Sequence, residues 1–295
     1  MNDSSLIAHC YRLLGSTTEA IEIATEVTAR PSTGAGGGAS GVGGGVVEAA
    51  TLACLTRAGS RPLPSDLAAP SAHPEGALSE SSEILWLEPI PEHLMDGRPI
   101  DLGLIAALQR IPPRERAATI LHDIEGWPED RITTLLGDVR PTPLTVRPSA
   151  AVPDEALLAR YRAAFEQYDV PAIVTLFTDD AIWEMPPFTS WFRGARDIGR
   201  LITTHCPAEH PGDQYLVPLK ANGLPAFAVY MRDPRDNIHH AFQIQVLTLT
   251  ATAIVHAVAF FDLSLFQTFH LPDLLQGLPP NPYDGTLRPH IERRH

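Results

Sequence analysis

Residues 135–152 read LLGDVRPTPLTVRPSAAV and carry prolines at positions 141, 143 and 148. Proline has no amide proton and clashes with the preceding helical turn, which costs about 3 kcal/mol inside a helix. This stretch is therefore predicted to contain no helix after Gly137. It also separates two patterns, because helical spacing dominates before it and strand-like alternation dominates after residue 153.

The N-terminal half is predicted to be helical. Residues 5–29 form two helical segments broken at Gly15-Ser16, and residues 61–99 are a Pro/Ser/Glu-rich extended connector in which Trp86 and Leu87 dock on a neighbouring surface. Residues 34–45 hold eight glycines in twelve positions and indicate a flexible tether. The further helical patterns cover residues 46–57, 101–110, 112–122 and 128–136.

The C-terminal half mixes helices and strands. An amphipathic helix with Asp154 as its N-cap opens it, and a second helix, a strand and a third helix follow. Four strand-like runs come next, separated by turn residues. Three helices before an antiparallel meander predict an α+β unit, a curved sheet wrapped on a helix with a cavity inside the cone.

Charge and cysteine content narrow the function classes. The net charge is −13, with 11 Arg against 19 Asp and Glu in residues 1–150 and 11 Arg or Lys against 16 in residues 151–295. Neither half has the cationic surplus on which nucleic-acid affinity depends, so we expect no DNA binding. Cys10, Cys54 and Cys206 lack paired spacing and fit reduced thiols in the cytoplasm. No signal peptide or membrane span is predicted.

Two family resemblances span nearly the whole chain. Residues 107–137, ALQRIPPRERAATILHDIEGWPEDRITTLLG, resemble the first part of the minus-35 reading domain of extracytoplasmic-function (ECF) sigma factors of RNA polymerase. LIAHCYRLLGSTTEAIEIATEV (6–27) resembles the start of their polymerase-binding helical domain, and WLEPIPEHLMD (86–96) resembles a connector of the subgroup with a C-terminal extension. MPPFTSWFRG (185–194), LVPLKANGLPAFAVYMRD (216–233) and AFFDLSLFQTFHLP (259–272) resemble the SnoaL-like branch of the NTF2-like fold.

The sequence departs from the sigma pattern at both DNA-reading elements. The glycine-rich tether stands where the minus-10 helices are expected, and the proline-rich stretch stands where a basic recognition helix should follow Gly137. We infer a sigma-derived scaffold that no longer selects promoters. The alternative is a divergent sigma factor that uses other surfaces or regulates polymerase without reading DNA. The predicted regions are sigma-2-like helices and tether (1–60), connector (61–100), sigma-4-like helices (101–150), SnoaL-like cone (151–280) and tail (281–295).

The resemblance to limonene-epoxide-hydrolase-like cones implies which residues face inward: Ile182, Glu184, Phe227, Val229, Ala257, Ala259 and Phe261. Apolar residues stand where the epoxide hydrolases of this fold carry their three catalytic Arg and Asp side chains. Glu184 is therefore the candidate acid. A register error of one residue would turn it outward. His239 and Gln243 are candidates to orient a substrate or relay a proton. Trp183 and Met185 flank Glu184, and Trp191 and Tyr230 are candidates for the cone mouth. The histidines lack zinc-like spacing, so we expect neither metal nor cofactor.

Three functions compete on this evidence. We favour an enzyme of specialised metabolism that cyclises, isomerises or rearranges a hydrophobic polyketide- or terpenoid-like molecule. The second is a sigma factor or transcription regulator with the cone as a regulatory domain, and the third is a ligand-binding protein without chemistry. RNA polymerase core is thus a disfavoured partner. Homodimerisation through the outer face of the sheet is left open, because the helical half could cover that face instead.

Overall fold

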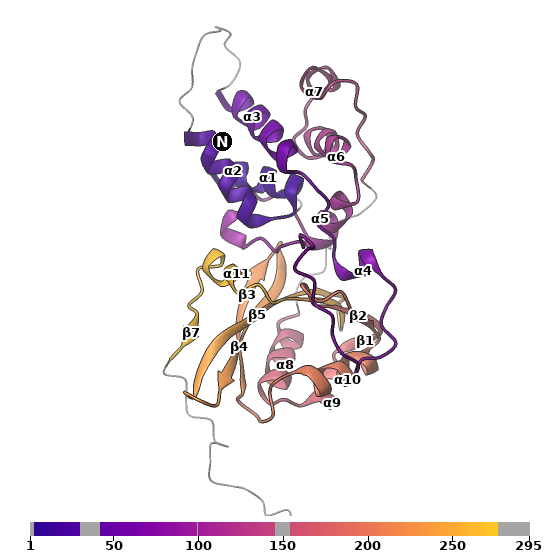
Figure 1. Cartoon of the computed structure of the whole chain (residues 1–295), viewed down its shortest axis with the longest axis vertical. Helices are drawn as coiled ribbons and strands as arrows, with labels where there is room; N and C mark the ends of the chain where they lie inside the picture. The colour runs from indigo at the N-terminus through magenta and orange to yellow at the C-terminus, as the bar shows by residue number, and fades with distance from the viewer. Residues whose placement is uncertain (1–2, 30–41, 99, 145–153, 277–295) are drawn as a thin grey trace, which may run out of the picture.

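The computed structural model describes residues 3–29, 42–98, 100–144 and 154–276. Six of its helices form a helical half, which packs on one side of a curved sheet, and three further helices lie against the other side (Figure 1). The α+β architecture and the cone are therefore as predicted. None of the helices in the described ranges combines the length and hydropathy that a membrane span needs.

The first three helices pack against one another at the N-terminus. Gly15 breaks the first two with a φ of +67°, and a side chain there would lie 2.9 Å from Gln109 and Leu87. The third helix begins at Val42, so residues 42–45 of the predicted tether are helical, while residues 34–41 lie outside the described residues. The bounds are α1 (Asp3–Leu14), α2 (Thr17–Ala29) and α3 (Val42–Arg57).

The connector leads from α3 to a second group of helices. It is extended apart from two short turns, and Leu87 is buried as predicted. Asp101 caps the next helix by accepting a hydrogen bond from the Leu104 amide. The elements are α4 (Pro64–Leu67), η1 (Glu92–Leu94), α5 (Leu102–Gln109), α6 (Pro113–Thr119), the π-helical turn η2 (Ile120–Ile124) and α7 (Glu129–Leu136).

The proline-rich stretch behaves as its sequence predicts in the part that the structure describes. Helix α7 ends at Gly137, which has a φ of +77°. Residues 138–144 form neither helix nor strand, and residues 145–153 lie outside the described ranges. Helical structure resumes only at Glu155, where Asp154 caps α8.

The cone is a strongly curved sheet with three helices on its concave side. The strand order is β2-β1-β6-β5-β4-β3, with β7 paired to the far end of β5. Strands β3 to β6 form the predicted antiparallel meander, while β1 pairs in parallel with β6. The elements are α8 (Glu155–Glu166), α9 (Val170–Val174), β1 (Phe177–Glu184), β2 (Trp191–Arg193), α10 (Ala195–His205), β3 (Gln214–Ala221), β4 (Leu224–Asp233), β5 (Ile238–Leu249), β6 (Ile254–Phe260), α11 (Ser264–Thr268) and β7 (Leu274–Leu275).

The two faces of the sheet belong to different cores. The concave face joins α8, α9 and α10 in one apolar cluster. Ala226, Ala228 and Ile244 on the convex face join the helical half in a second cluster. The chain's own helices therefore cover the surface through which a homodimer was considered. Tyr230 lies on this convex face, against Phe266, rather than at the cone mouth as predicted.

Candidate functional site

One buried asparagine joins the cone to the helical half. Asn222 lies in the turn between β3 and β4, has a φ of +54° and is 1% exposed. Its Oδ1 accepts a hydrogen bond from the Ile90 amide at 3.1 Å, and its Nδ2 donates to the Tyr11 hydroxyl at 2.8 Å and the Ile100 carbonyl at 2.9 Å. A single side chain thus bonds α1, the connector and the segment before α5. Burial raises the pKa of Tyr11, which keeps its hydroxyl protonated.

A carboxylate on β1 makes the second contact between the cone and the connector. Glu184 Oε2 accepts a hydrogen bond from the Ser65 amide in the first turn of α4 at 2.7 Å. Its Oε1 pairs with His256 Nε2 on β6 at 2.8 Å. Glu184 therefore faces away from the cone interior, on the opposite side of β1 from Trp183 and Met185. The inward orientation predicted for Glu184 and Ile182 is wrong by one residue, because successive strand residues point to opposite faces.

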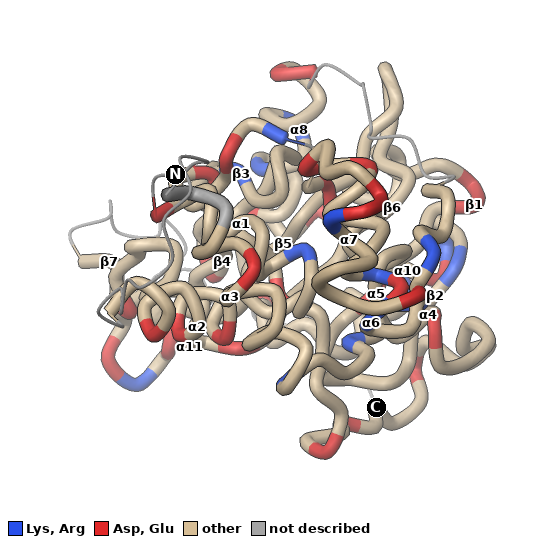
Figure 2. Tube along the Cα trace, turned by 90° about the horizontal axis from the view of Figure 1, so that it is seen from above, with Lys and Arg blue, Asp and Glu red and all other residues tan. Residues whose placement is uncertain are grey.

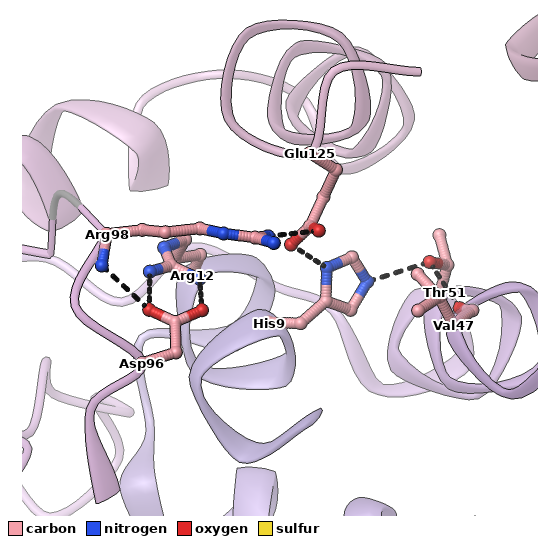
Figure 3. A network of polar contacts seen from close by, with 7 residues as sticks. All are labelled: His9, Arg12, Val47, Thr51, Asp96, Arg98 and Glu125. Atoms are coloured by element: carbon pink, nitrogen blue, oxygen red, sulfur yellow. Dashed lines mark hydrogen bonds and ion pairs between the residues drawn. The ribbon is translucent and has the colours of Figure 1, made fainter. Parts of the chain in front are cut away.

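A buried polar network holds the helical half together (Figure 3). His9 of α1 contacts Thr51 Oγ1 of α3 at 2.8 Å and Glu125 Oε1, after η2, at 3.3 Å. Arg98 at the end of the connector also pairs with Glu125. One turn along α1, the buried Arg12 pairs with Asp96 at 2.6 Å.

The electrostatics of this network favour ionised groups. Burial alone would raise the pKa of the Glu125 carboxyl, but hydrogen bonds and charge interactions from His9 and Arg98 outweigh it and lower the pKa to about 2. Burial likewise opposes ionisation of Asp96, and the Arg12 guanidinium overcomes it, so that the pKa of Asp96 is lowered. These pairs join α1 to the connector and to the residue that follows η2.

The cone contains a partly open cavity of about 320 Å³. Its wall combines the sheet, α8, the end of α10 and one residue of the connector, Leu78. Burial raises the pKa of the Cys206 thiol, which disfavours its reactive thiolate form. The lining residues are Leu78, Phe165, Trp183, Met185, Phe188, Leu201, Ile202, His205, Cys206, Pro207, Gln214, Phe242, Gln243 and Phe261.

Four of the residues predicted to contact a ligand line this cavity: Trp183, Met185, Gln243 and Phe261. Two of their polar atoms, Trp183 Nε1 and Gln243 Oε1, are buried without a hydrogen-bond partner. The sequence missed Leu78 and Phe165, because a connector leucine and a helical phenylalanine carry no signal of a shared cavity.

The other predicted site residues lie elsewhere. Four form the tightly packed core of the cone beside the cavity: Phe227, Val229, Ala257 and Ala259. His239 contacts the Gly212 carbonyl through Nε2 at 2.9 Å, and burial lowers its pKa. Trp191 Nε1 donates to the Ala68 carbonyl at 2.8 Å, which ties it to the connector. Asp262 Oδ1 accepts a hydrogen bond from the Ser264 amide at 2.9 Å, at the start of α11.

The architecture defines a class: a helical half of sigma-like helices packed on an NTF2-like cone. No family model matches the chain. The chain is 41% identical over 304 residues to the ECF RNA polymerase sigma factor SigG of Mycobacterium tuberculosis, in strains CDC 1551 / Oshkosh and H37Rv, covering 92% of this chain and 82% of SigG. The chain belongs to the ECF sigma factor family.

One solved structure shows the same overall fold. The crystal structure of the M. tuberculosis ECF sigma factor SigJ superposes with a TM-score of 0.62 and 18% identity, covering 91% of this chain and 97% of SigJ. An NTF-2 like protein of Burkholderia xenovorans matches with a TM-score of 0.30 and 16% identity over 36% of this chain and 80% of that chain.

These comparisons overturn the function favoured from the sequence. A metabolic cyclase or isomerase was expected because the DNA-reading helices are interrupted and the cone interior is apolar. The relative that matches 92% of the chain is a sigma factor, so the enzyme prediction is wrong. The prediction assumed that a chain without the two DNA-reading elements has also lost the function of a sigma factor. The remaining helices, however, pack together as one unit.

Proposed function

We propose that this protein binds core RNA polymerase through its helical half and regulates transcription in the cytoplasm, with the cone as its regulatory domain. The observation that carries the proposal is the 41% identity to SigG over 92% of the chain. The buried pairs of Figure 3 support it, because they keep the helices that resemble the polymerase-binding domain folded against the rest of the protein.

The side of α7 where a sigma factor of this type would read DNA does not favour nucleic acid. A cleft next to α7 is lined by three carboxylates, Asp123, Glu129 and Asp138, and by one guanidinium, Arg140. Figure 2 shows Asp and Glu over both halves, with Lys and Arg scattered among them. Because phosphate contacts require concentrated positive charge, we propose that the protein acts on polymerase without reading the minus-35 element through this side.

The experiment is a competition assay. Fluorescently labelled SigG is bound to M. tuberculosis core RNA polymerase, and the unlabelled protein is titrated in while anisotropy is recorded. We expect displacement of SigG, and no transcription from a promoter that SigG itself transcribes. Failure to displace SigG would overturn polymerase binding, whereas promoter-dependent transcripts would overturn the claim about DNA reading.

A matched pair of surface variants localises the contact. Leu52 on α3 is 46% exposed and Leu263 beside α11 is 53% exposed. Placing a charge at either site leaves the cores untouched, since neither side chain is buried. If the helical half binds polymerase, Leu52→Asp should weaken the competition and Leu263→Asp should leave it unchanged. The reverse pattern would assign the contact to the cone.

A further inference from the structure

The cavity in the cone has a size and a lining that point to a particular ligand chemistry. An engineered apolar cavity of about 150 Å³ holds one benzene ring, so the 320 Å³ here correspond to a molecule of about two fused rings. The lining holds no Asp, Glu, Lys or Arg among the described residues. His205 lines it, but its Nε2 is engaged with the Pro74 carbonyl at 3.1 Å. Since a charged guest would be desolvated without a counter-charge, the cavity selects neutral molecules.

Two polar atoms without a hydrogen-bond partner indicate which polar group the ligand carries. Trp183 Nε1 is a donor and Gln243 Oε1 is an acceptor, and both are buried in residues that line the cavity. Each lacks the hydrogen bond that it would make in water, so a guest that supplies the partner is favoured. A hydroxyl group can satisfy either atom, because it can accept from an indole N–H or donate to an amide oxygen.

The connector forms a strap over one side of the cavity. Residues 71–81 run from α4 along the β1–β2 side of the cone toward α10 (Figure 1). Their backbone is bonded to the cone, from the Ser71 amide to the Trp191 carbonyl at 2.8 Å and from the Ser81 amide to the Pro187 carbonyl at 3.0 Å. The Thr189 amide donates to the Ser79 carbonyl at 2.9 Å. Leu78, at the centre of this strap, contributes its side chain to the cavity wall.

We propose that the cone binds a neutral, hydroxyl-bearing apolar molecule of about two fused rings, and that the connector strap closes over it through Leu78. The inference rests on the regulatory role proposed for the cone. The strap continues through α4, where the Ser65 amide bonds Glu184, into the helical half. Occupancy of the cavity is thereby linked to the segment that joins the sigma-2-like and sigma-4-like helices.

Calorimetric titration of the full chain with three probes tests the ligand class. The probes are 2-naphthol, 2-methylnaphthalene, which has the same shape without the hydroxyl, and 2-naphthoate, which is charged. We expect 2-naphthol to bind about tenfold more tightly than 2-methylnaphthalene, from the hydrogen bond that its hydroxyl adds, and 2-naphthoate not to bind. Equal affinity for the first two probes, preference for 2-naphthoate, or no binding of any probe would each overturn the proposal.

Variants assign the binding to the cavity and the strap. Gln243→Met removes the acceptor at similar volume and should reduce 2-naphthol affinity about fivefold, whereas Gln267→Met, the same change at an exposed site on α11, should have no effect. Leu78→Ala should weaken all binding, and Leu85→Ala, at a connector leucine that is 58% exposed, should not. If Leu78→Ala binds like the unaltered protein, the strap is not part of the site. These titrations contain no polymerase, so their failure is distinct from a failure of the competition assay.

Discussion

The junction at Asn222 yields the sharpest stability prediction. Asn222→Gly removes three side-chain hydrogen bonds but keeps the φ of +54°, which glycine adopts without strain. Tyr11 keeps its bond to the Glu88 carbonyl at 2.7 Å, so the unpaired groups are the Ile90 amide and the Ile100 carbonyl. At about 1–3 kcal/mol for each of these two buried polar groups left without a partner, the free energy of unfolding should fall by about 2–6 kcal/mol.

Asn222→Ala provides the internal check. Alanine loses the same bonds and must also hold a left-handed conformation, which costs about 1–2 kcal/mol more. Alanine should therefore be less stable than glycine here, the reverse of the usual order. Urea unfolding followed by tryptophan fluorescence measures both. Asn237→Gly, at an exposed turn residue with a φ of +60°, is the control and should change stability by less than about 1 kcal/mol. Losses below about 1 kcal/mol at Asn222, or an alanine variant more stable than the glycine variant, would refute the reasoning.

Three further predictions concern the charged groups. Arg12→Met leaves the Asp96 carboxylate buried without its guanidinium and should cost about 3–5 kcal/mol in urea unfolding; a loss below about 1 kcal/mol would contradict the buried pair. Glu125 keeps its charge to a pKa of about 2 when folded, against 4.5 for the unconstrained group, because its histidine and arginine partners outweigh burial. Its contribution of about 3 kcal/mol is therefore complete above pH 4.5 and is lost as the pH falls toward 2, and Glu125→Gln should flatten the stability profile in that window. Glu184→Gln weakens the pair with His256 and should cost about 1–2 kcal/mol while 2-naphthol affinity stays unchanged; a tenfold change in affinity would place its carboxylate in the cavity after all.

The local features of the fold were predictable from the sequence. The break at Gly15, the cap at Asp154 and the end of α7 at Gly137 each depend on a few consecutive residues, whose backbone preferences decide the structure there. The curved sheet was predictable from alternation in four consecutive runs. Residues 42–45 are the exception, because they form the first turn of α3 despite the low helix propensity of glycine.

The candidate site was predictable only in part. Trp183, Met185, Gln243 and Phe261 meet at one cavity, although Glu184, and not the Trp183 and Met185 beside it, was predicted to face inward. Glu184 was predicted on the wrong face of β1. Residues 183–185 are all buried, so their burial pattern does not show which face of the strand points into the cone. Both faces of β1 are covered here, one by the cone core and the other by the connector, so polarity gave no guide to the register.

The sequence by itself determined where the backbone could and could not be helical, since Pro141 and Pro143 act on their own neighbours whatever surrounds them. Only the tertiary structure decided that Asn222 would bond α1 and the connector, and that Leu78 would close a cavity formed by strands more than a hundred residues away. Such contacts join residues distant in sequence, and they exist because the helical half buries the convex face of the sheet while the connector crosses its edge.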